Sequence, residues 1–153
     1  MRGSVEVISH HSILLANLLS QVHILKSASK RLDSLLADIR SVLQGELFDD
    51  ELSVAQELRK KSHLRAAGAI AGVVLEEHLK QIVSTHLIKM PKGDPTIGDL
   101  NDVLRAANIY GVPTWRFIQR LADIRNLCVH SMDRDPTPTE VEELIAGTDK
   151  TVT

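Results

Sequence analysis

The sequence predicts an all-α protein, a helical bundle of four or five helices with a long N-terminal helix. Only 3% of the 153 residues are aromatic and 43% are hydrophobic, so a core must be built mainly from Leu, Ile, Val and Ala. Apolar residues recur three, four and seven positions apart, which is the spacing of one helix face. Proline- and glycine-containing segments separate these stretches, and none of them reads convincingly as a strand. The length fits one domain that can bury a core.

The charge balance and the cysteine content narrow the classes of function. The net charge is −2 and the isoelectric point is near 6.4, whereas a protein that relies on non-specific phosphate contacts is basic. Any contact with nucleic acid should therefore be local. Cys128 is the single cysteine, which excludes an internal disulfide and fits a reducing compartment. No apolar run approaches the roughly 20 residues of a membrane span, so we expect a cytoplasmic protein with no membrane contact.

The N-terminal part of the chain divides into a short leader and one long helix. Residues 1–4, Met-Arg-Gly-Ser, resemble an expression-vector leader, so an upstream domain of a larger protein could be missing. Residues 5–44 are predicted to be helical, with Gly45 as the C-cap. Two apolar rows follow a heptad spacing: Ile8, Leu15, Val22, Leu36 and Leu43, with Ser29 as the exception, and Leu18, Leu25, Leu32 and Ile39. Further apolar residues widen the stripe: Leu14, Leu19, Ile24 and Leu35. The helix either packs on its own domain, mediates oligomerisation or links to an upstream domain.

A second helix is expected from Ser53 to Leu87, at the start of a helical domain over residues 53–150. Its centre is made of small residues, with Gly68 and Gly72 one turn apart. A neighbouring backbone can approach closely there, either within the core or across a dimer. The acidic pair Glu76-Glu77 follows, as a solvated face or with one member turned inward to meet a buried arginine.

Capping signals predict the shorter helices. Thr96 followed by Asp99 forms a capping-box pattern, and the helix that it begins should end near Ala107. A turn separates it from a helix that starts at Thr114. The last helix begins after Thr137, because Pro138 and Glu140 complete a second capping box. We expect it to end near Ala146, with Gly147 beyond it.

The helix that starts at Thr114 carries the one arrangement suited to chemistry: Arg125, Asn126 and His130. An arginine can clamp a phosphate with its planar fork of donors, and a histidine can move a proton near neutral pH. Arg125 lies on the flank of the apolar face, about 140° from His130 on an ideal helix. The two side chains converge only if the last turn is distorted or the arginine reaches round. Alternatively, Arg125 forms a structural ion pair and His130 binds the last carbonyls of the helix.

Other residues add less. Arg116 and Arg120 could extend a phosphate-binding surface around His130, although a solvated face is the simpler interpretation. Cys128 lies on the apolar face and reads as a core residue rather than a thiolate. The histidines show no metal-ligand spacing, and no HExxH segment, CxxC pair or glycine-rich phosphate loop is present. We therefore expect no metal and no cofactor.

The segment from Leu121 to His130 resembles the motif helix of the HEPN domain family (higher eukaryotes and prokaryotes nucleotide-binding). That family's signature is an arginine, often followed by a polar residue, with a histidine shortly afterwards near the end of an all-α domain. The segment Thr137–Ile145 also resembles the family, and the likeness covers about residues 53–150. One departure is Met132, where some toxin members have a tyrosine.

The resemblance implies a bundle that dimerises and brings two motifs into one composite cleft. Many members are metal-independent endoribonucleases of toxin–antitoxin, antiphage or CRISPR-associated systems, and others are non-catalytic interaction domains. Carried over, Arg125 would hold the scissile phosphate, His130 would activate the RNA 2′-hydroxyl or orient the phosphate, and Asn126 would position the histidine or substrate. We thus expect a homodimeric ribonuclease of a prokaryotic toxin or defence protein, with a possible antitoxin partner. The alternative is a non-catalytic dimerisation or interaction domain of a larger protein.

Overall fold

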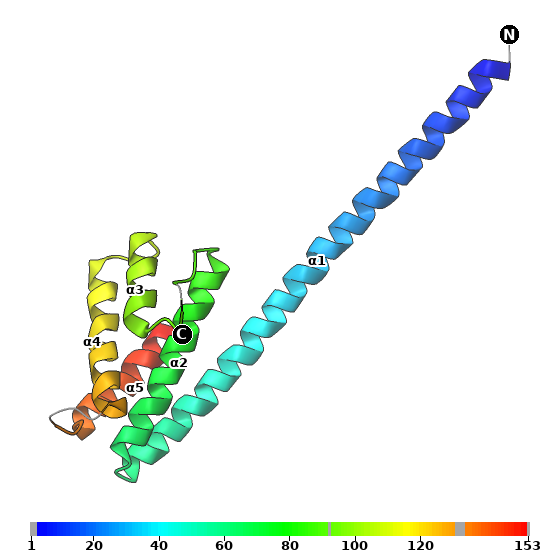
Figure 1. Ribbon diagram of the computed structural model, residues 1–153. Coiled ribbons are helices and arrows are strands. Elements are labelled where there is room, and N and C mark those ends of the chain that lie inside the picture. Colours follow the sequence, from blue (N-terminus) through cyan, green and yellow to red (C-terminus); the bar gives the residue numbers. More distant parts are fainter. Residues whose placement is uncertain (1–2, 92, 131–133, 153) are drawn as a thin grey trace. The chain divides into compact units, whose positions relative to one another are not determined.

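The computed structural model describes residues 3–91, 93–130 and 134–152, of which residues 3–12 and 41 are described by their backbone alone (Figure 1). Five helices account for almost all of these residues: α1 (Gly3–Lys60), α2 (Leu64–Thr85), α3 (Ile97–Ala106), α4 (Val112–Val129) and α5 (Pro138–Val152). No strand occurs in the described ranges, and the all-α prediction is confirmed. The chain forms two compact units, Met1–Gln44 and Gly45–Thr153. Met1 and Arg2 of the expected leader lie outside the described residues.

Helix α1 continues through Gly45, so the predictions that a helix ends there and that another begins at Ser53 were wrong. A glycine inside a helix costs only about 1 kcal/mol relative to alanine, and the residues after Gly45 favour a helix. The break comes at Ser62, which adopts the left-handed conformation with φ 64°. The amides of Ser62 and His63 donate to the carbonyls of Arg59 and Leu58, which is a Schellman ending. Serine in this position leaves no clear signal in the sequence.

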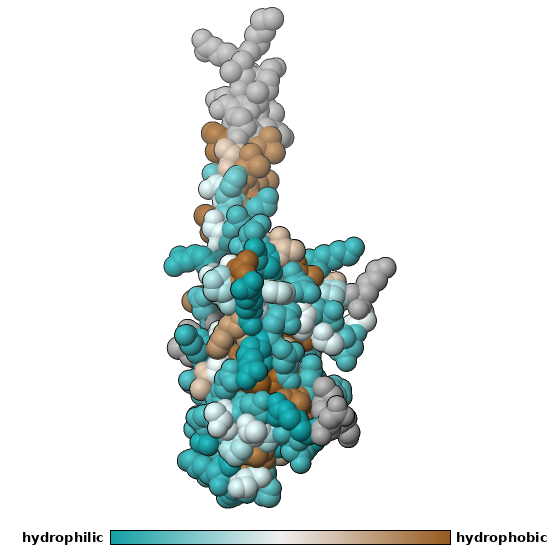
Figure 2. Space-filling model, turned by 90° about the vertical axis from the view of Figure 1, so that its left-hand side faces the viewer, coloured by the Kyte–Doolittle hydropathy of each residue, from teal (hydrophilic) through white to brown (hydrophobic). Residues whose placement is uncertain are grey.

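In the first unit, Met1–Gln44, residues 3–44 form a single helix in which the large apolar side chains from Ile13 onward are exposed. They include the apolar residues of the two heptad rows from Leu15 onward and the residues that widen the stripe: Leu14, Leu19, Ile24 and Leu35. Figure 2 shows hydrophobic atoms gathered on the surface of this part of α1. No described side chain of the first unit covers them.

The second unit, residues 45–153, is a bundle in which α2 contacts α3, α4 and α5, while α4 also contacts α3 and α5 (Figure 1). The C-terminal part of α1 contributes the buried side chains of Phe48, Leu52 and Ala55 to the same core. The rings of Phe48 and His78 meet edge to face, with centroids 6.3 Å apart. In the part of the chain that the structure describes, no helix is both long enough and apolar enough to span a membrane.

Three glycines allow close helix contacts inside the second unit. A Cβ atom at Gly68 would lie 2.2 Å from the Cys128 sulfur, and one at Gly72 would lie 2.3 Å from Cγ of Arg125. The expected close approach at this pair therefore occurs within the bundle, between α2 and α4. A Cβ at Gly147 would lie 2.6 Å from a methyl carbon of Leu121. Gly147 thus lies inside α5 as a contact point, and the prediction that α5 ends at Ala146 was wrong.

Both predicted capping boxes are confirmed. The Thr96 amide donates to Asp99 at 2.9 Å, and the Asp99 amide donates to the Thr96 hydroxyl at 3.2 Å. At the start of α5, the Thr137 amide donates to Glu140 at 2.9 Å and the Glu140 amide donates to the Thr137 hydroxyl at 3.3 Å. These contacts are local, which is why the sequence pattern located them.

Candidate functional site at the end of helix α4

Arg125 lies between α4 and α2, with its aliphatic stem against Gly72. Its side chain is 22% exposed, and Nη2 lies 3.4 Å from a carboxylate oxygen of Glu76. Nη1 donates to the Asn126 side-chain oxygen at 3.5 Å. Both contacts are long for charge-assisted bonds, which are usually about 2.7–2.9 Å. Nε is buried and has no hydrogen-bond partner among the described residues, so the guanidinium retains unused donors.

Glu76 is shared between two cations. Its second oxygen lies 2.8 Å from Nζ of Lys80, and Lys80 also contacts Glu77 at 2.9 Å. Hydrogen bonds from these carboxylates, that to Glu76 first, raise the pKa of Lys80. Of the acidic pair, Glu76 is the member that meets the arginine, and Glu77 remains exposed. The two carboxylates and two cations form a network with no net charge.

His130 is the C-cap of α4, with an extended backbone at φ −97° and ψ 151°. Its amide donates to the Asn126 carbonyl at 3.0 Å, and its side chain is exposed. No side-chain hydrogen bond joins His130 to Arg125 or Asn126 within the described ranges. Met132, at the position where the family pattern differs, lies outside the described residues. The structure therefore places the three motif residues at one helix end without closing them into a hydrogen-bonded group.

Arg65, at the start of α2, holds that helix end and was not predicted. Its Nη1 donates to the carbonyls of Leu127 at 3.3 Å, Cys128 at 3.3 Å and His130 at 3.1 Å. Its Nε and Nη2 donate to one oxygen of Asp135 at 3.0 and 2.7 Å. The last carbonyls of a helix need donors, and a cation suits them. As the alternative to a catalytic role, the sequence had suggested that His130 binds these carbonyls. Arg65 binds them instead, and no described residue is hydrogen-bonded to the imidazole of His130.

Cys128 is buried against Gly68, as predicted for a core residue. Burial raises the pKa of its thiol, and the nearby charge of Arg65 offsets part of this effect. A thiol with a raised pKa is a poor nucleophile at neutral pH. Cys128 therefore packs α4 against α2.

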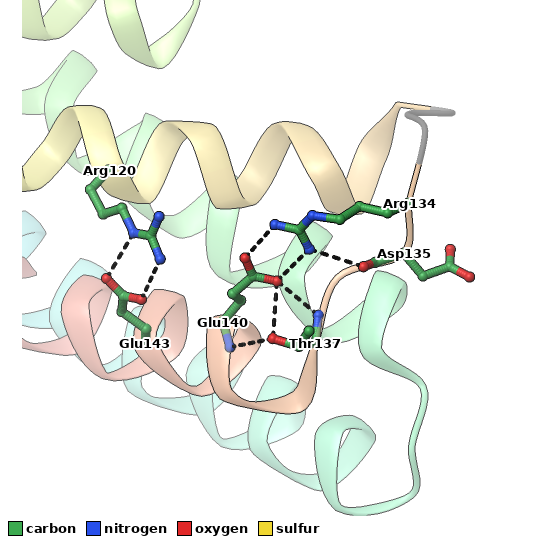
Figure 3. Close-up of polar contacts among 6 residues, drawn as sticks. All are labelled: Arg120, Arg134, Asp135, Thr137, Glu140 and Glu143. Carbon is green, nitrogen blue, oxygen red and sulfur yellow. Dashed lines mark hydrogen bonds and ion pairs between the residues drawn. The ribbon is translucent and has the colours of Figure 1, made fainter.

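Arg120 and Arg134 are bound to α5 rather than free for a phosphate (Figure 3). Nε and Nη2 of Arg120 donate to the two oxygens of Glu143, each at 3.1 Å. Arg134 donates to Glu140 at 2.8 Å, next to the Thr137 cap. Arg116 is exposed and has no hydrogen bond or ion pair in the described part of the chain. Between these groups lies an open pocket of about 300 Å³. It is lined by Arg120, Asp123, Ile124, Asn126, Leu127, Arg134 and Glu140.

The predicted site residues therefore fall into separate places. Asn126 and Arg120 line the pocket between α4 and α5, whereas Arg125 points toward α2 and His130 follows the helix end. Among the described residues, no group of three His, Cys, Asp or Glu side chains is placed to hold a metal ion. Comparisons of the chain with protein-family models, with curated proteins and with solved structures find no match. The function must therefore be argued from the residues themselves.

Proposed function

We propose that this chain is a HEPN-like domain that cleaves RNA without a metal ion and acts as a homodimer. The contacts and exposure of the motif residues at the end of α4 support this proposal. Arg125 has an unpartnered Nε and two long contacts, while His130 is exposed on a helix end that Arg65 holds. An arginine with spare donors and an unhindered histidine are the two groups that metal-free cleavage requires.

In the proposed reaction, the fork of Arg125 binds the scissile phosphate and stabilises the charge that develops on it. His130 accepts the proton of the 2′-hydroxyl as its oxygen attacks phosphorus. The bond to the 5′-oxygen breaks, that oxygen takes up a proton from solvent water, and the products carry a 2′,3′-cyclic phosphate and a 5′-hydroxyl. Asn126 would orient the substrate or the histidine. Because the two side chains share no hydrogen bond in one protomer, the proposal needs the motifs of two protomers in one cleft.

A second candidate is a non-catalytic interaction domain of a larger protein, and the Arg125–Glu76 ion pair favours it. A carboxylate of the same protomer is paired with the guanidinium that would bind the phosphate, as expected of an arginine with a structural role. The substitution Glu76→Gln separates the two candidates. If Arg125 binds RNA, removing the competing charge should raise RNA affinity or cleavage. If Arg125 is structural, the variant should only lose stability, since a partly buried cation loses its partner.

The decisive experiment is cleavage of labelled single-stranded RNA in EDTA by the parent, Arg125→Ala, His130→Ala and a matched control, His86→Ala. His86 is also an exposed histidine at a helix C-cap. We expect the parent and His86→Ala to cleave and to leave cyclic-phosphate ends, while the two motif variants do not. Helicity and dimerisation should be the same in all four proteins. Cleavage that is equal in all variants would contradict the proposal, and a parent without activity would favour the interaction domain.

A further inference from the structure

The first unit carries a hydrophobic surface that no described residue of that unit covers. Residues 13–44 form one helix whose heptad rows are exposed: Leu15, Val22, Leu36 and Leu43 at the a positions, and Leu18, Leu25, Leu32 and Ile39 at the d positions. Ser29 takes the remaining a position. Apolar residues at both rows are the pattern of a coiled coil. The question is which helix covers them, and in which direction it runs.

The two rows that flank the seam differ in character. The g row is apolar apart from one glutamine: Leu14, Gln21, Ala28, Leu35 and Val42. The e row becomes charged after its first residue: Leu19, Lys26, Asp33 and Arg40. In a parallel dimer each g row faces the partner's e row, which would put Leu35 beside an arginine and Ala28 beside an aspartate. Reversing one helix instead sets the two g rows together and the two e rows together.

Charge then selects one antiparallel register. When Val22 is level with Ile39 of the partner subunit, Lys26 faces Asp33 of the partner subunit, and the symmetry repeats this pair. A shift of seven residues one way sets Lys26 against the partner's Lys26. A shift the other way sets Asp33 against the partner's Asp33. Like charges at flanking positions oppose pairing, so of these three registers only the first is complementary.

We propose that a second copy of this chain covers the seam of residues 18–43 as an antiparallel coiled coil, with Lys26 of each copy beside Asp33 of the other. The a and d rows form the buried layers, the apolar g rows close one flank, and the charged e rows set the register on the other. This pairing does not depend on the proposed ribonuclease activity, because none of its residues belongs to the motif of α4.

Cross-linking of the full chain tests the direction. The variants Val22→Cys and Ile39→Cys are oxidised separately and as a mixture, with the parent as control because its one cysteine is buried. We expect disulfide-linked dimers only in the mixture. In the proposed register the two copies of residue 22 are about 26 Å apart along the axis, too far for a disulfide. Efficient dimers of either variant alone would show a parallel pair and overturn the proposal.

Charge reversal tests the register. Lys26→Asp should weaken dimerisation about tenfold or more, since it creates two like-charged contacts, and Lys26→Asp with Asp33→Lys should restore it. Arg40→Asp is the matched control, because Arg40 faces Leu19 of the partner subunit in this register. Association is measured by sedimentation equilibrium. A parent that remains monomeric at about 100 μM, which is about 100 times a micromolar Kd, would overturn the proposal. A double variant that dimerises no more tightly than Lys26→Asp alone would also overturn it.

Discussion

The contact between α2 and α4 at Gly68 supports a quantitative prediction. In Gly68→Ala the new Cβ would lie 2.2 Å from the sulfur and 2.9 Å from Cβ of Cys128. Both distances are too short for real atoms, and the second involves a carbon fixed to the backbone, so α4 must move. Overpacking of this kind costs about 1–3 kcal/mol, while alanine regains about 1 kcal/mol of helix propensity over glycine. We expect a net loss of up to about 2 kcal/mol in the free energy of unfolding.

Urea denaturation followed by circular dichroism, at one fixed protein concentration, measures this loss. Gly45→Ala is the matched control, because nothing lies within 4 Å of a Cβ there. The same substitution should stabilise by up to about 1 kcal/mol at that exposed helical position. Combining Gly68→Ala with Cys128→Ala removes the sulfur and should make the two effects less than additive. A Gly68→Ala protein as stable as Gly45→Ala would refute the close packing of α2 on α4.

Three further predictions concern polar contacts. Arg65→Ala removes the donor to three carbonyls and the Asp135 pair. The substitution should accelerate hydrogen exchange of the amides in the last turn of α4. Unchanged exchange rates would show that these contacts do not hold the helix end. The ion pair with Arg134 lowers the pKa of Glu140 to about 2, so the stability it contributes is present above about pH 4.3 and is lost as pH falls toward 2. Glu140→Gln should be less stable than the parent at pH 7. Its melting temperature should also change less than that of the parent over this pH range. The Tyr110 hydroxyl donates to the buried Asn101 at 2.6 Å, and Tyr110→Phe should lower the free energy of unfolding by about 1 kcal/mol, with no change if water replaces the bond.

The sequence by itself determined the features that depend on neighbours three to seven residues away. The two capping boxes at Thr96 and Thr137 and the apolar rows of α1 are such features, because their partners are near in the chain. The burial of Cys128 also followed from its place on the apolar face of its helix. The motif residues could be named for the same reason, since Arg125 and His130 lie within two turns of each other.

The roles of the glycines and of the long arginine side chains were decided only by the tertiary structure. Glycine signals a helix end or a close contact equally well, and the neighbours that distinguish these roles at Gly72 and Gly147 come from other helices. Helix α1 ends at Lys60, and the left-handed residue that follows, Ser62, is not a glycine and gives no sequence signal. Arg65 reaches carbonyls that lie more than 60 residues further along the chain, and Arg125 meets Glu76 from another helix. Such pairs form only when packing brings distant segments together, which is why spacing along the chain does not reveal them.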